Sequence, residues 1–257
     1  MSRRAVVYQS SGVSRSPTMF HMGTAKSQIK RMLHRAGVEV TGYQWTIESR
    51  RRRLLRNVDV LADVGANVGQ YAQAARGSGW GGRIISYEPL AAAFVALRLA
   101  AESDPAWTVV HTAVGSEVGD LTLNVSANDV FSSALPTLDR GRNLFTGMAA
   151  ARAEQVSVAT LDGLLAEQLD QGLRIGVKVD VQGFERAVLL GAARTLELAD
   201  FWEMELTPAP LYEGQMLMAE GLERLADAGL TLVGVENIFT DVHTGRSLQF
   251  NGLFLRD

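Results

Sequence analysis

The chain of 257 residues has no cysteine, no long hydrophobic run and little excess of either charge. Without cysteine it can form no disulfide, no thiolate metal site and no cysteine nucleophile. No stretch approaches the roughly 18 uninterrupted apolar residues of a membrane span, and the apolar run near the N-terminus is too short for a signal peptide. A formal net charge of −3 gives no reason to expect binding to nucleic acid. We therefore expect a cytoplasmic protein without a membrane span.

Histidine is also scarce, with four residues in the chain. None stands in a Ser-His-Asp arrangement or in a His-rich metal motif, so the sequence does not support a hydrolase. His243 lies in a late loop, where a histidine is usually a surface residue. A chain of this length with 47% hydrophobic residues can form one large α/β domain, and a second full domain is not expected.

We expect three parts along the chain. Residues 1–22 lack hydrophobic periodicity and are interpreted as a mobile arm, residues 23–56 as a helical extension, and residues 57–257 as the main domain. The extension ends in a basic patch, Arg50 to Arg53, whose plainest interpretation is a solvated helix face. Contact with an anionic lipid or a phosphosugar is the alternative, and the sequence does not decide between them.

Strands and helices alternate in the main domain, which predicts parallel pairing with right-handed crossovers. The expected core strands cover residues 59–63, 83–87, 107–112, 175–179 and 201–206. Residues 231–236 and 247–255 would close the sheet as an antiparallel pair. Residues 126–155 are interpreted as one long polar loop, and loops of this length inside a compact domain are usually functional or disordered.

The most informative motif is Asp-Val-Leu-Ala-Asp-Val-Gly-Ala-Asn-Val-Gly at residues 59–69. An apolar strand ends at Asp63, the chain then turns through glycine, and a helix begins at Asn67. This strand-turn-helix is typical of nucleotide-binding α/β sheets. Gly65 and Gly69 carry no side chain that could block a ligand.

Two acids at the ends of adjacent strands favour a cationic ligand over a dinucleotide. Glu88 ends the strand expected beside the first one, so it can accept hydrogen bonds from both hydroxyls of a ribose. A pyrophosphate held by helix N-terminal amides would be repelled by Asp63, which stands two residues before the first glycine. S-adenosylmethionine has no phosphate and carries a sulfonium, an ammonium and a ribose diol, so it suits both acids.

Five motifs, taken in order, resemble those of the FkbM-type methyltransferases. They are Asp63-Val-Gly-Ala-Asn-Val-Gly-Gln-Tyr71, Tyr87-Glu-Pro-Leu90, Asn128 with Ser132-Ser133, Lys178-Val-Asp-Val-Gln-Gly-Phe-Glu185, and Glu205 ahead of Pro210-Leu-Tyr212. The resemblance runs from about residue 57 to the C-terminus. It implies a Rossmann-like class I fold with a mostly parallel seven-stranded sheet and a closing antiparallel hairpin. It also implies O-methylation of hydroxyls on sugars, glycolipids or polyketide-type natural products.

The resemblance further assigns the residues that bind the methyl donor. It places S-adenosylmethionine against the first two motifs, through Asp63, Gly65, Ala66, Asn67, Gly69, Tyr71 and Glu88. The passage at Ala113 would lie near the adenine ring. Ser132 and Ser133 gain a role at the site by analogy, although turn formation would also explain them. The acceptor is not implied, because family members differ in it.

Taking a proton from a weakly acidic hydroxyl asks for a base or a metal ion. Lys178 and Asp180 lie two residues apart on a buried strand and so share one face. Asp180 stands at the carboxyl end of that strand, where open α/β sheets build their sites. Glu205 ends the next strand, so Asp180 and Glu205 could serve one acceptor hydroxyl as a base or bind one Mg²⁺. A structural ion pair between Lys178 and Asp180 is the alternative.

Two other functions remain open. An NAD(P)-dependent oxidoreductase would need a catalytic tyrosine-lysine pair, and Tyr71 is expected in the wrong helix for one. A non-catalytic S-adenosylmethionine-binding protein would keep the donor site without the chemistry, and the presence of Lys178, Asp180 and Glu205 argues against it. Neither the identity of the acceptor nor the oligomeric state follows from the sequence.

Overall fold

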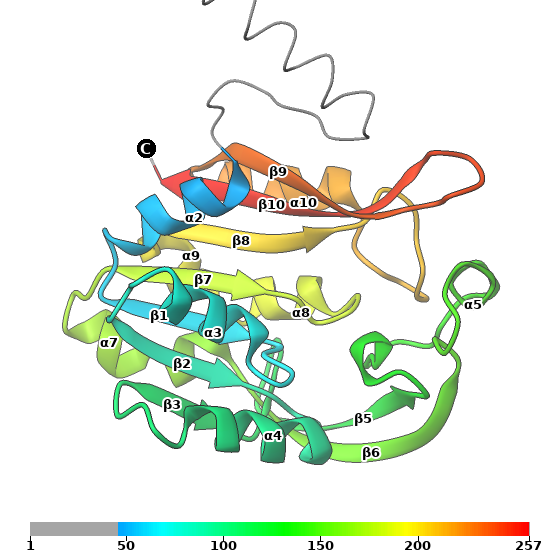
Figure 1. The fold of residues 1–257 in the computed structure, drawn as a ribbon, viewed down its shortest axis with the longest axis horizontal. Coiled ribbons are helices and arrows are strands. Elements are labelled where there is room, and N and C mark those ends of the chain that lie inside the picture. The colour runs from blue at the N-terminus through cyan, green and yellow to red at the C-terminus, as the bar shows by residue number, and fades with distance from the viewer. Residues whose placement is uncertain (1–45, 257) are drawn as a thin grey trace, which may run out of the picture. The chain divides into compact units, whose positions relative to one another are not determined.

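The computed structural model describes residues 46–256, and their main feature is a seven-stranded sheet (Figure 1). The strand order is β3-β2-β1-β7-β8-β10-β9. The strands are β1 (Val60–Val64), β2 (Arg83–Tyr87), β3 (Trp107–Val110), β7 (Ile175–Val179), β8 (Phe201–Leu206), β9 (Leu230–Thr240) and β10 (Ser247–Arg256). Strand β10 pairs antiparallel with β8 and β9, and the other pairings are parallel. The expected sheet and its closing hairpin are confirmed.

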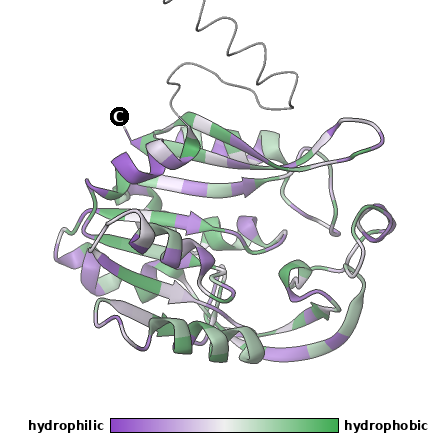
Figure 2. Ribbon diagram, viewed as in Figure 1, coloured by the Kyte–Doolittle hydropathy of each residue, from purple (hydrophilic) through white to green (hydrophobic). Residues whose placement is uncertain are grey.

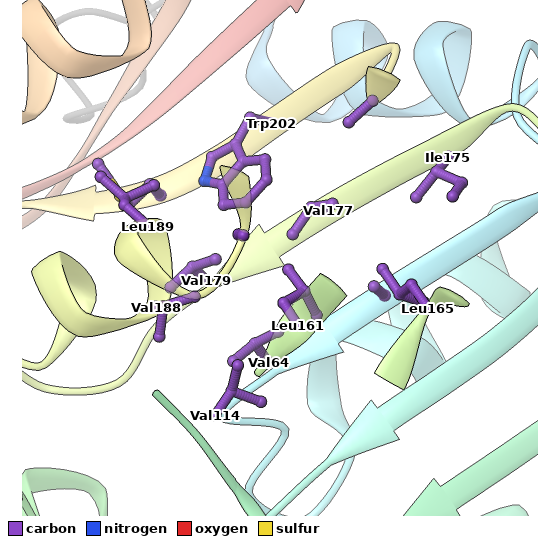
Figure 3. Packing of buried hydrophobic residues seen from close by; sticks show 14 of the residues in the cluster. Val64, Val114, Leu161, Leu165, Ile175, Val177, Val179, Val188, Leu189 and Trp202 are labelled. Carbon is purple, nitrogen blue, oxygen red and sulfur yellow. The ribbon is translucent and has the colours of Figure 1, made fainter. Parts of the chain in front are cut away.

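Helices pack on both faces of this sheet. They are α2 (Ile47–Leu55), α3 (Gln70–Gly77), α4 (Ala91–Ala101), α6 (Leu161–Leu164), α7 (Ala166–Asp170), α8 (Glu185–Leu190), α9 (Ala193–Leu198) and α10 (Met218–Asp227). On one face, α2 and α4 bury Leu54 and Leu97. On the other face, Leu161 of α6 and Val188 of α8 pack with Trp202 of β8 (Figure 3).

The central strands are buried on both sides, which is why their sequences are nearly continuous hydrophobic runs. Along β1, Val60 and Ala62 face the cluster with α6 and α8, and Leu61 faces the cluster with α2 and α4. The same two-residue period places Asp63 on the side of Leu61. Hydrophilic residues interrupt the hydrophobic strands β7 and β8 (Figure 2). One of them, Lys178, lies opposite Asp63 in the sheet register.

A second, three-stranded sheet corrects the expectation of one loop over residues 126–155. It consists of β4 (Ala113–Val114), β5 (Gly119–Ser126) and β6 (Ala150–Ala159), in the order β4-β6-β5. Strand β6 begins inside the expected loop, and its first half, Ala-Ala-Arg-Ala-Glu, is largely exposed and contains no large hydrophobic residue that would mark a strand. Residues 127–149 remain as a shorter connection, with η1 (Asp129–Phe131) and α5 (Asp139–Leu144).

Helix α2 belongs to the same compact unit as the sheet, and this unit begins at Thr46. Leu54 and Leu55 are buried in the core, and Thr46 caps the helix by accepting a hydrogen bond from the backbone amide of Ser49. The expected arm over residues 1–22 and most of the expected extension over 23–56 lie outside the described residues. None of the helices within residues 46–256 is long and apolar enough to cross a membrane.

Gly65 is the point at which the backbones after β1 and β7 come closest. Its φ is +72°, and a Cβ there would lie 1.8 Å from the backbone oxygen of Asp180. The backbone amide of Asp180 also donates to the oxygen of Val64, at 3.1 Å. The contact between two backbones, in addition to any space for a ligand, therefore requires glycine at this position.

We predict that Gly65→Ala destabilises the fold itself. Gly172 has a φ of +65° with no atom within 4 Å of its Cβ position, so Gly172→Ala isolates the cost of the left-handed backbone. In that control the free energy of unfolding should fall by about 1–2 kcal/mol. In Gly65→Ala it should fall by about 1–3 kcal/mol more, because the backbone of Asp180 must move. Urea unfolding measures both losses. Equal losses would contradict the close approach.

Candidate active site

A pocket of about 520 Å³ lies at the carboxyl ends of the parallel strands. Its wall includes many residues predicted from the sequence, namely Gly65, Ala66, Asn67, Tyr71, Glu88, Ala113, Ser132, Lys178, Asp180 and Glu205. The η1 segment and the end of β9 complete the wall. The structure therefore gathers residues far apart in the sequence at the edge where open α/β sheets bind ligands.

Glu88 follows β2 and is fixed by two backbone amides. The amide of Asn67 donates to its Oε2 at 2.7 Å, and the amide of Leu90 donates to its Oε1 at 2.8 Å. Asn67 adopts a left-handed conformation with φ +49°, which turns its amide toward the carboxyl group. Glu88 is only 4% exposed, and this burial raises its pKa to about 7 despite the two amides. A carboxylate offers about four acceptor positions, so about two remain for a ligand.

Asp63 is not in the wall of the pocket, so its expected contact with the donor stays a prediction. It is completely buried, and its Oδ1 lies 3.2 Å from Nζ of Lys178. The Lys178 ammonium also donates to the backbone oxygen of Gly65 at 2.9 Å. Burial lowers the pKa of Lys178, but the charges of Asp63 and Asp180 outweigh it and the pKa is raised. The direct ion pair of Lys178 is therefore with Asp63 and not with Asp180, the partner that the sequence suggested as an alternative.

Arg51 shows that the basic patch on α2 is not a uniform solvated face. Its guanidinium is one-fifth exposed and forms ion pairs with Glu203 and with Glu236. Glu203 also accepts a hydrogen bond of 2.8 Å from the hydroxyl of Tyr71. Glu203 therefore has two partners from helices that are far from it in the sequence. Burial and the charge of Glu203 raise the pKa of Tyr71.

Asp180 and Glu205 meet at the amide of Gln182. Nε2 of Gln182 donates to Oδ1 of Asp180 at 2.7 Å and to Oε2 of Glu205 at 3.3 Å. Burial, followed by the charges of Asp180 and Glu185, raises the pKa of Glu205 well above its usual range. The sequence places Gln182 in a motif with these acids but does not predict this contact.

The geometry gives the Mg²⁺ alternative no support. Among residues 46–256, no three His, Cys, Asp or Glu side chains are grouped so that they could hold a metal ion. Asp180 and Glu205 direct oxygen atoms at the neutral amide of Gln182, a donor that competes with a cation for the same lone pairs. Their arrangement suits a base better than a pair of metal ligands.

Gly69 and Ser133, two further predicted donor contacts, have structural partners in the protein. Gly69 begins α3 with φ +88°, and a Cβ there would lie 2.8 Å from the ring of Trp107, so its glycine is required by packing. Ser133 is buried, and its hydroxyl donates to the backbone oxygen of Gln182 at 2.6 Å. Neither residue lines the pocket. His243 is exposed in the hairpin loop, as expected for a surface histidine.

The strand order and a pocket at the carboxyl ends of the parallel strands, with an acid after β2, define a Rossmann-like α/β fold with a ligand-binding site. A family model described as "Methyltransferase FkbM domain" matches residues 63–231. The chain therefore belongs to the FkbM methyltransferase family, and the resemblance found in its motifs is confirmed.

Solved structures with a similar fold are distant in sequence. A TehB-like SAM-dependent methyltransferase from Corynebacterium glutamicum is 12% identical, with 92% of this chain and 99% of that chain covered and a TM-score of 0.39. The Burkholderia thailandensis 1,6-didemethyltoxoflavin-N1-methyltransferase, with bound 1,6-didemethyltoxoflavin and S-adenosylhomocysteine, is 13% identical, with coverages of 96% and 94% and a TM-score of 0.42. A search of curated proteins found no match.

We predict that Asp63→Asn destabilises the protein by about 3–5 kcal/mol, because it leaves the buried Lys178 ammonium without its direct ion pair. Adding Lys178→Met should recover part of this loss, since both charges are then gone. Asp170→Asn is the control, because Asp170 is 69% exposed in its ion pair with Arg194. This substitution should lower the free energy of unfolding by less than about 1 kcal/mol. Similar losses in urea unfolding for Asp63→Asn and Asp170→Asn would contradict this account.

Proposed function

We propose that the chain transfers a methyl group from S-adenosylmethionine to a hydroxyl of a sugar, glycolipid or polyketide-type acceptor. The observation that carries the proposal is one pocket with two kinds of carboxylate. Glu88 keeps about two acceptor positions for the two hydroxyls of a ribose. Asp180 and Glu205 lie in the same wall, where a proton acceptor for a hydroxyl would be needed.

The charges around the pocket support a cationic donor over a dinucleotide. Its wall contains five carboxyl groups, from Glu88, Asp129, Asp180, Glu205 and Glu236. Its cations are already paired, Arg51 with Glu203 and Glu236, and Lys178 with Asp63. A sulfonium and an ammonium gain from such a wall, whereas the pyrophosphate of NAD(P) would meet a net negative charge.

Tyr71 argues against the oxidoreductase alternative. Lys178 lies 5.9 Å from the centre of its ring, but the Tyr71 hydroxyl donates to Glu203. The pKa of Tyr71 is raised by burial and by that carboxylate, whereas a tyrosine that acts as a general acid or base near neutral pH needs a lowered one. The pair therefore lacks the electrostatics of a tyrosine-lysine catalytic couple.

The carboxylates perform the part of the reaction that the donor cannot. Bound S-adenosylmethionine would supply an electrophilic methyl group. In the transfer, the acceptor O–C bond forms as the C–S bond breaks, and the hydroxyl proton passes to Asp180 or Glu205. A raised pKa makes Glu205 the stronger base of the pair once it is ionised. Alignment of the two reactants by the pocket could contribute about 7–11 kcal/mol.

An apolar end of the pocket supports an acceptor whose hydroxyl is attached to an apolar body. Val130 and Phe131 from the η1 segment and Ile238 and Phe239 from β9 lie in the wall. The rings of Phe131 and Phe239 are 6.5 Å apart, and Phe145 lies 5.1 Å from Phe239. Phe239 is 38% exposed, so its ring can contact a ligand. These contacts favour a glycolipid or polyketide over a free sugar.

We predict that donor affinity falls as the pH is lowered from about 8 to about 6. Burial raises the pKa of Glu88 to about 7 in the free protein. Below that pH the carboxyl is protonated, so donor binding must first remove the proton. The donor affinity should then fall by at most about tenfold per pH unit. Calorimetric titration with S-adenosylmethionine measures the effect. Glu88→Gln should bind more weakly at about pH 8 and lose most of the pH dependence. An unchanged pH dependence would rule out Glu88 as the diol ligand.

We predict methyl transfer from labelled S-adenosylmethionine to a component of a fractionated glycolipid or natural-product extract. With that acceptor, Asp180→Asn should lower kcat by about 10²–10⁴-fold, because the side chain keeps its size but loses the charge of a base. The affinity for the donor should stay nearly constant. EDTA should leave the activity intact, whereas a loss of activity that Mg²⁺ restores would favour Asp180 and Glu205 as metal ligands.

Full turnover of Asp180→Asn would contradict both the role of a base and that of a metal ligand. Transfer of the methyl group to nitrogen would contradict O-methylation.

A further inference from the structure

Gln182 holds an unfavourable backbone conformation between two functional carboxylates. Its φ is +52°, a left-handed value that residues other than glycine rarely adopt. The hydroxyl of buried Ser133 donates to its backbone oxygen at 2.6 Å. Its side-chain amide reaches Asp180 at 2.7 Å and Glu205 at 3.3 Å. The strained turn thus directs one NH₂ group at two acids on neighbouring strands.

Tyr212 fixes which end of this amide faces the acids. Its hydroxyl lies 3.2 Å from Oε1 of Gln182 and 3.0 Å from the backbone oxygen of Phe131. Both of these atoms are acceptors, so the single hydroxyl proton is shared between them. With Oε1 held toward Tyr212, the NH₂ end must face Asp180 and Glu205. Tyr212 is completely buried and does not line the pocket itself.

We propose that Gln182, oriented by Tyr212, is a positioning residue that holds Asp180 and Glu205 around one amide, so that the two carboxylates act on the acceptor as a single unit. The inference rests on the proposed function for its catalytic meaning. The hydrogen-bond geometry stands apart from that function and can be tested without an acceptor.

Several charges act on Glu205. Lys178 lies on β7 and Asp180 directly follows that strand. Glu185 comes from α8, where it accepts hydrogen bonds from the amides of Val181 and Gly183. Burial and the two acids raise the pKa of Glu205, while Lys178 and the hydrogen bond from Gln182 lower it. The sign of the amide's effect is therefore clear. A donor to the ionised carboxylate stabilises its charge, so removing the donor must raise the pKa further.

The test is a pH titration of carboxyl groups by NMR in the full chain labelled with glutamate carrying ¹³C at the side-chain carboxyl, with Glu205 assigned from the spectrum of Glu205→Gln. Gln182→Asn is the main variant, because asparagine tolerates a left-handed backbone but is one methylene shorter and cannot bridge both acids. We expect the Glu205 midpoint to rise by about one pH unit. Tyr212→Phe, which leaves Gln182 in place, should raise it by less.

Gln171→Asn serves as the matched control, because Gln171 donates to Glu167 on an exposed helix and its change should leave Glu205 unmoved. An unmoved Glu205 midpoint in both Gln182→Asn and Tyr212→Phe would overturn the proposal, and so would a fall in either. If Gln182→Asn does not fold, Tyr212→Phe decides alone, because its hydroxyl lies outside the pocket wall. A loss of stability without a shift would mean a purely structural role.

Once an acceptor is known, the same variants separate this proposal from the proposed function. Gln182→Asn should lower kcat by about tenfold or more and move the acidic limb of the kcat profile to higher pH, while the Kd for S-adenosylmethionine stays constant. A shifted NMR midpoint with no methyl transfer to any acceptor would contradict the function and leave the amide bridge standing. Methyl transfer by Gln182→Asn with an unmoved Glu205 midpoint and an unmoved pH profile would support the proposed function and contradict the amide bridge.

Discussion

The buried Lys178 ammonium in the middle of the sheet is the interaction on which the site depends. Asp63, Lys178 and Glu203 lie opposite one another on β1, β7 and β8, so one row of charges crosses three strands. Each of these charges would cost several kcal/mol if it were buried alone. Arg51 extends the row from α2 to Glu203 and ties the helix to the sheet. The row therefore fixes the register of the strands whose carboxyl ends form the pocket.

The same lysine connects the two functional ends of the pocket. Its Nζ donates to the backbone oxygen of Gly65, which leads to the turn that presents the amide of Asn67 to Glu88. Gly65 in turn lies against the backbone of Asp180, whose side chain belongs to the carboxylate pair. A displacement at Lys178 would therefore reach both ends, because interiors packed this closely transmit strain instead of absorbing it.

The sequence predicted the positions of the acids better than their partners. The two-residue period of strands places Glu88, Asp180 and Glu205 at the carboxyl edge without knowledge of the fold. The period says nothing about the residue across the sheet, so the ion pair of Asp63 with Lys178 does not follow from the sequence. Strand β6 is not evident in the sequence because its exposed first half contains no large hydrophobic residue and is held by pairing with β5. The left-handed turn at Gln182 has no hydrophobic pattern to reveal it, and the aromatic contacts of Phe239 join segments about 100 residues apart in sequence.

The charge of the pocket also bears on the direction of the proposed reaction. A wall rich in carboxylates, with its cations already paired, attracts a sulfonium before transfer. Transfer of the methyl group leaves a neutral thioether, and the proton released by the acceptor neutralises one carboxylate. Both changes weaken the attraction between the wall and the spent donor at the same step. The buried row of ion pairs thus does more than stabilise the sheet, because it removes Lys178 and Arg51 from the balance of charge that the ligand experiences.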